Sequence, residues 1–169
     1  HGGGIDLIFP HHENEIAQST CSNDMKKFAN FWLHNGFLKI EGEKMSKSLN
    51  NFLTVFDLIK RDFSGPAIRY NMLSTHYRQP LDWKFERLAE AEKTLIKWNN
   101  KKESENEVDL PQQVLNALLD DINTPLSIYE MHQLYKNGKF ADLTKACAFF
   151  EFVPKGKKGN LPISLALSK

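Results

Sequence analysis

From residue 84 to residue 153, apolar residues recur at steps of three and four, which is the spacing of one face of an α-helix. Four segments carry such a stripe, and each would bury it against its neighbours. This part of the chain is therefore predicted to be a helical bundle, with the stripes as its core. The stripes are Leu88, Ala91, Leu95 and Trp98; Val114, Leu115, Leu118, Leu119 and Ile122; Ile128, Met131 and Tyr135, after Thr124-Pro125; and residues 140–153.

The first 54 residues have a different pattern, with short apolar runs between glycines and polar residues. GGGIDLIF (2–9) is interpreted as a loop that leads into a short buried strand, and GFLKIEG (36–42) as another strand. Helices are predicted at 11–20, directly after Pro10, and at 28–35. Strands alternating with helices indicate an α/β arrangement in this region.

A short helical stretch joins the two regions. Thr54 is predicted to cap a first helix and Pro66 to begin a second helix over 65–77. The predicted fold is part of an α/β nucleotide-binding (Rossmann-like) domain followed by an α-helical bundle, and it is mostly helical overall. The expected divisions are 1–54 for the α/β part, 55–83 for the connecting region, 84–153 for the bundle and 154–169 for a flexible tail.

Composition excludes several classes of protein. The 169 residues can bury a core without disulfides, and 22 basic against 21 acidic residues give a formal net charge of +1. Two distant cysteines, Cys21 and Cys147, make no disulfide framework and fit a reducing cytoplasm. No apolar run is long enough to span a membrane. Because a strand-like segment follows His1 almost at once, the chain is expected to be a piece of a longer protein.

A polar run from Gly42 to Phe52 separates two apolar segments. Lys44 and Lys47 can place two ammonium groups near one polyanion, and the serines between and after them add hydroxyl donors. The string KMSKS (44–48) is identical to the signature loop that closes over ATP in class I aminoacyl-tRNA synthetases. The chain therefore resembles that class.

The opening stretch HGGGIDLIFPHHENE holds a second group of functional candidates. On a helix, His11 and Glu15 lie one turn apart on the same face, so both can bind one Zn²⁺ ion, although two ligands do not close a zinc site. The glycines at 2–4 allow the backbone to approach a ligand closely. Asp6 is placed to accept hydrogen bonds from ribose hydroxyls.

These stretches, with THYR at 75–78 and DINTP at 121–125 following in order, resemble the cysteinyl-tRNA synthetase family over about residues 1–135. The resemblance implies an enzyme that activates cysteine with ATP and Mg²⁺ to cysteinyl-adenylate and then transfers the cysteine to tRNA(Cys). It also implies a cytoplasmic enzyme, which we expect to be a monomer.

The resemblance further implies residue roles. The family binds one Zn²⁺ per subunit through two cysteines, a histidine and a glutamate, and this metal selects the substrate thiol over the serine hydroxyl. His11 and Glu15 match two of these ligands, and the others are expected outside this chain. Lys47 matches the lysine that stabilises charge on the ATP phosphates. The remaining candidates are Lys44 for catalysis and His1, Gly3 and Asp6 for binding cysteine and ATP.

Three features depart from the family pattern. The chain has no His-x-Gly-His motif, and Cys21 and Cys147 are interpreted as core or helix-end residues, so that two zinc ligands have no counterpart here. Asn50 stands where the family usually has glycine. We therefore expect the isolated chain to form no adenylate. Two alternatives remain open: a mycothiol-type cysteine ligase, which couples cysteine to an amino sugar, and a truncated, non-catalytic module that binds RNA or a partner.

Overall fold

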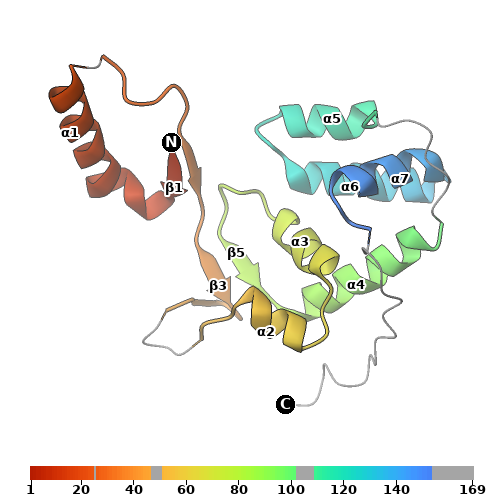
Figure 1. The fold of residues 1–169 in the computed structure, drawn as a ribbon. Helices are drawn as coiled ribbons and strands as arrows, with labels where there is room; N and C mark the ends of the chain where they lie inside the picture. The colour runs from red at the N-terminus through yellow and green to blue at the C-terminus, as the bar shows by residue number, and fades with distance from the viewer. Residues whose placement is uncertain (25, 47–50, 102–108, 154–169) are drawn as a thin grey trace.

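The computed structural model describes residues 1–24, 26–46, 51–101 and 109–153. Two small sheets lie in the first half of the chain, and helices dominate the second half. Figure 1 shows β1 and α1 at one end of the molecule and α5, α6 and α7 at the other, with β3, β5, α2 and α3 between them. In the described residues no helix is long and apolar enough to cross a membrane.

The first sheet is a parallel pair of strands, β1 (Gly2–Gly4) and β2 (Leu33–Asn35), with Gly3 opposite His34. The strand in this stretch is formed by the glycines, which were predicted to be a loop. Glycine is required here because a Cβ at Gly2 would stand 2.9 Å from the Leu33 carbonyl oxygen. The helix predicted at 28–35 is wrong, since the Leu33 N–H donates to the His1 carbonyl at the start of this strand pair.

The residues that follow β1 are helical turns rather than strand. A 3₁₀ turn, η1 (Ile5–Leu7), leads into a kinked turn, η2 (Ile8–His12), and then into α1 (Glu13–Asn23). Phe9 within the kink has extended backbone and is 76% exposed. The prediction of a buried strand at the end of 2–9 is therefore wrong, and the helix predicted after Pro10 is confirmed.

The second sheet has the order β4-β3-β5, in which β3 (Leu38–Ile40) confirms the strand predicted within 36–42. β4 (Glu43–Lys44) is antiparallel to β3, whereas β5 (Leu81–Trp83) is parallel to it and returns through two helices. The sequence analysis did not predict β5. Three residues are too few to show an alternating pattern.

The connecting helices begin where their caps indicate. α2 (Val55–Lys60) starts with a capping box in which the Thr54 hydroxyl accepts from the Asp57 N–H and the Asp57 carboxylate accepts from the Thr54 N–H. The Thr54 hydroxyl also donates to the Asp57 carboxylate at 2.6 Å, and this bond, together with the one from the Thr54 N–H, lowers the pKa of Asp57. α3 (Gly65–Leu73) begins after Ser64 and ends before the predicted residue 77.

The bundle consists of α4 (Phe85–Asn99), α5 (Gln112–Leu119), α6 (Thr124–Lys136) and α7 (Phe140–Phe149). All four predicted stripe residues of α4 are buried, as are Ile128 and Met131 of α6. The predicted α5 stripe is only partly correct, because Leu119 is 74% exposed. α5 ends there, and Asp121 and Ile122 then turn the chain with left-handed backbone.

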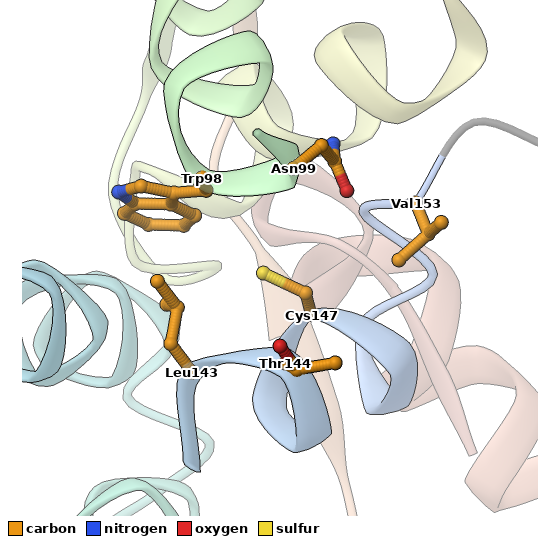
Figure 2. Close-up of a pocket in the computed structure, with 6 residues that line it drawn as sticks. All are labelled: Trp98, Asn99, Leu143, Thr144, Cys147 and Val153. Carbon is orange, nitrogen blue, oxygen red and sulfur yellow. The ribbon is translucent and has the colours of Figure 1, made fainter. Parts of the chain in front are cut away.

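One continuous core joins the connecting helices to the bundle, from Leu58 to Phe152. A water-sized hollow of about 10 Å³ remains between α4 and α7. Figure 2 shows the Cys147 sulfur directed from α7 towards α4 beside this hollow. Cys147 is 3% exposed and thus packs in the core, as predicted, while Cys21 is exposed in the last turn of α1.

Candidate metal and nucleotide site

The Glu15 carboxylate is the centre of a histidine cluster where β1, β2 and the start of α1 meet. The Nε2 atom of His11 lies 3.5 Å from Glu15 Oε1, so the predicted pair is brought together. The Nε2 atom of His1 lies closer, 2.9 Å from Glu15 Oε2, and that of His12 lies 4.0 Å from the same oxygen. Three imidazoles from two elements therefore face one carboxylate.

His12 is the buried member of this cluster, with 3% of its surface exposed. Its Nδ1 atom shares a hydrogen bond with His34 Nε2 at 2.9 Å, which leaves its Nε2 atom on the side of Glu15. Gly3 makes room for this ring, because a Cβ at Gly3 would stand 3.1 Å from His12 Cε1. The absence of side chains in the glycine run thus lets the backbone lie close to Leu33 at Gly2 and close to the His12 ring at Gly3.

Aromatic rings form a wall beside the cluster. The His1 ring meets the rings of His12, Phe28 and Trp32 edge-on, with centroids 4.8–5.0 Å apart. Trp32 in turn stacks on His34 with an angle of 9° between the ring planes. Packing of this kind restricts the orientation of the imidazoles, which a metal site needs from its surroundings.

The donor set fits a zinc ion. The ligand atoms of His1, His12 and Glu15 all lie within 4.8 Å of one another, and imidazole nitrogens with a carboxylate oxygen are ligands that Zn²⁺ accepts. His11 offers a fourth donor from a more exposed side chain, at 59% exposure. Sequence reasoning named His11 and Glu15 as ligands and His1 as a cysteine-pocket residue, but it missed His12 and His34. The available signal was the spacing of three residues between His12 and Glu15.

Lys44, the first lysine of the polar run predicted to bind phosphate, lies on the other sheet. Lys44 is in β4, exposed, with its Nζ atom 4.6 Å from the centroid of the Phe37 ring. Asn51 closes the base of the loop, because its Oδ1 atom accepts from the Ser46 N–H at 2.9 Å and its Nδ2 atom donates to the Lys44 carbonyl at 3.2 Å. Lys47 and Asn50 lie outside the described residues. Asp6 is exposed in η1.

Comparison with known proteins decides the family. The family model described as "tRNA synthetases class I (C) catalytic domain" matches residues 1–93. The chain is 52% identical over 145 residues to the cysteine–tRNA ligase of Ruegeria pomeroyi, and 49% identical over 152 residues to that of Rhodopseudomonas palustris. The chain belongs to the cysteinyl-tRNA synthetase family. These alignments cover 85% and 86% of the chain, so they extend from the catalytic region into the bundle.

The family relatives are much longer than this chain. The chain spans 31% of the Ruegeria pomeroyi ligase, 33% of the Rhodopseudomonas palustris ligase and 35% of the Rhizobium etli ligase. Among solved structures, the LeuRS of Agrobacterium radiobacter, in a ternary complex with tRNA and LeuAMS, has a similar fold, with a TM-score of 0.60 at 17% identity. That match covers 88% of this chain and 23% of the LeuRS chain, and it confirms the fold class.

The matched catalytic region contains every candidate site residue of this synthetase chain. His1, Gly3, Asp6, His11, Glu15 and both motif lysines fall within residues 1–93. The histidine cluster and the KMSKS loop are nevertheless built on separate sheets, since β1 pairs with β2 and β4 pairs with β3.

Proposed function

We propose that this chain carries part of the active site of a cysteine–tRNA ligase, which activates cysteine with ATP and transfers it to tRNA(Cys). The observation that carries this proposal is the convergence of three histidines on the Glu15 carboxylate, in a chain that also contains KMSKS. Family membership supports the same reaction. The proposed divisions are those expected from the sequence, namely 1–54, 55–83, 84–153 and a tail, in a monomeric cytoplasmic enzyme.

Within this proposal, His11 and Glu15 hold one Zn²⁺ ion, with further ligands outside this chain. A zinc ion supplies a Lewis acid that binds a thiolate far better than a hydroxyl and so distinguishes cysteine from serine. His12 and His34 orient the cluster through their shared hydrogen bond, and His1 stands between Glu15 and the aromatic wall. The cluster thus has ligands and supporting groups in contact with one another.

The nucleotide roles belong to the same proposal. Lys47 and Lys44 stabilise the phosphates of Mg²⁺-bound ATP, and Asp6 and Gly3 bind its adenosine part. Asn51 supports this role of the loop, since its side chain joins Ser46 and Lys44 on either side of Met45.

Zinc analysis of the full-length protein tests the metal site. We expect Glu15→Gln to lower bound zinc well below one equivalent, because it removes the anionic ligand. Glu13→Gln is the matched control, since Glu13 lies on the same helix and is exposed. Full zinc retention by Glu15→Gln, or equal loss in both variants, would contradict the ligand role.

Activity assays test the reaction and separate the alternatives. The full-length protein is expected to catalyse cysteine-dependent ATP–pyrophosphate exchange and to charge tRNA(Cys), while the isolated 169-residue chain does neither. We expect Lys47→Ala to slow adenylate formation by about 10²- to 10³-fold while cysteine binding is retained, because its charge acts on the transition state. Coupling of cysteine to an amino sugar instead of tRNA would favour the mycothiol-type ligase, and tRNA binding without exchange would favour the non-catalytic module.

A further inference from the structure

Asp121, in the turn between α5 and α6, receives side chains from a loop more than forty residues earlier. Its carboxylate accepts from Arg78 Nε at 2.6 Å and from Arg78 Nη2 at 3.1 Å, which is a two-point contact. It also accepts from the Tyr77 hydroxyl at 2.7 Å, and His76 Nε2 lies 3.9 Å away. We call these four residues the Asp121 clasp. In Figure 1 the turn between α5 and α6 extends towards the loop between α3 and β5.

The backbone at Asp121 is itself held in an uncommon conformation. Asp121 and Ile122 both have left-handed backbone, with φ of 53° and 56°, and a β-branched residue such as isoleucine rarely adopts it. The turn is secured by the Ile122 N–H, which donates to the Leu118 carbonyl, and by Asn123, whose side chain accepts from the Leu126 N–H to cap α6. A strained and well-bonded turn that presents one carboxylate indicates a defined role for that carboxylate.

The other side of the clasp is tied to the catalytic half of the chain. The Tyr77 carbonyl accepts from the Gly36 N–H at 2.8 Å, directly after β2. Gly36 cannot carry a side chain, because a Cβ would collide with the carbonyl of Gln79. The loop that holds Asp121 is therefore packed against the strand that holds His34, and His34 is hydrogen-bonded to His12 of the metal cluster.

We propose that Asp121 is a positioning residue. The Asp121 clasp sets the orientation of the turn between α5 and α6 relative to the histidine cluster around Glu15. Asp121 accepts from the Tyr77 hydroxyl, the Tyr77 carbonyl accepts from the Gly36 N–H, and the backbone then runs through Asn35 to His34, which bonds to His12. The series carries no chemistry of its own. Its role is to hold the turn between α5 and α6 in a fixed orientation relative to the cluster while cysteine is transferred to tRNA, and this inference rests on the proposed function.

The contact between Arg78 and Asp121 in the clasp is an ion pair. The hydrogen bonds from Arg78 and Tyr77 lower the pKa of Asp121 to about 2, so the carboxylate is ionised throughout the physiological range. The pKa of Arg78 is raised by the same contact. A substitution at Asp121 is therefore expected to open its contact with Arg78.

Kinetics of the full-length protein test this role. Asp121→Asn is expected to lower kcat/KM for tRNA charging by between about fivefold and a hundredfold, the usual range of coupling between sites, while ATP–pyrophosphate exchange stays within about twofold. Asp120→Asn is the matched control, because Asp120 is an exposed neighbour with the same charge, and both rates should be unchanged. Equal loss of charging and exchange in Asp121→Asn, or loss of neither, would overturn the proposal.

A second measurement does not depend on the enzyme's activity. In Asp121→Asn, hydrogen exchange of the Gly36 amide should be faster by about tenfold, because the loop that holds its acceptor, the Tyr77 carbonyl, has lost its contacts with the Asp121 carboxylate. Exchange along α4 should be unchanged. Unchanged exchange at Gly36 would reject the connection even if charging were slow. If the wild-type protein charges no tRNA, the proposed function fails. The hydrogen-exchange rate of the Gly36 amide then still decides whether the clasp connects the two regions.

Discussion

The two halves of this chain are held together by different means. From Leu58 to Phe152 a continuous apolar core buries side chains almost completely, and Leu88, Met131 and Val114 have no exposed surface. Among the described residues of 1–54 only His12 is buried. Large apolar side chains are exposed there, and Phe31, for example, is 86% exposed. Leu38, Ile40 and Leu53 pack against the edge of the apolar core, whereas the residues before them are organised by hydrogen bonds, ring contacts and close backbone approaches around Glu15.

This difference shows that the packed core and the candidate site lie in different regions of the chain. A packed core gives a rigid support that needs no ligand. A parallel strand pair is normally covered on both faces, and β1 and β2 leave Leu33 43% exposed. The region with the candidate site is therefore the one whose order depends most on what binds or covers it.

The largest expected difference in stability between the two halves is tested by making the same leucine-to-alanine substitution in each of them. Leu88→Ala, in the core, is expected to lower the free energy of unfolding by about 3 kcal/mol, because it leaves a cavity at a fully buried position. Leu33→Ala in β2 should cost less than about 1 kcal/mol. Urea denaturation of the full-length protein measures both. Equal losses would mean that the first half has a core that the burial pattern does not reveal.

A smaller effect is expected at the border between the halves. Thr54→Ala removes the capping box of α2, which joins the KMSKS segment to the core, and should cost about 1 kcal/mol. Thr54→Ser keeps the hydroxyl and is the control. Thermal denaturation with both variants compares them, and a Thr54→Ser loss as large as that of Thr54→Ala would show that the cap is not responsible.

The smallest effect concerns the bundle's own histidine. His132 bonds to the Tyr70 hydroxyl at 2.9 Å, with Trp98 at its edge and Lys136 nearby, and burial lowers its pKa. The same burial raises the pKa of Tyr70 to about 12. Because the folded state disfavours protonation of His132, stability should fall as the pH drops below the ordinary histidine value of 6.5. His132→Gln should remove that part of the slope, as measured by denaturation at pH 7 and pH 5.5, and an unchanged slope would count against it.

Local patterns in the sequence predicted α1 and the helices after residue 54, whereas the helix predicted at the described residues 28–35 is absent. The α4 stripe, the Thr54 cap and the His11–Glu15 pair all depend on residues three or four apart, and helix geometry alone brings such residues together. The motifs at 1–15 and 44–48 also predicted the family. The short strands were harder, because β1 consists of glycines and β5 has three residues, and neither shows a period.

The sequence by itself thus determined the helical bundle, the cap of α2 and the family. Only the tertiary structure decided that His1 meets Glu15, that His34 bonds to His12, and that Arg78 and Tyr77 hold Asp121. These partners are 14 to 44 residues apart. At such separations the path of the whole chain, and not the local backbone geometry, sets which side chains meet.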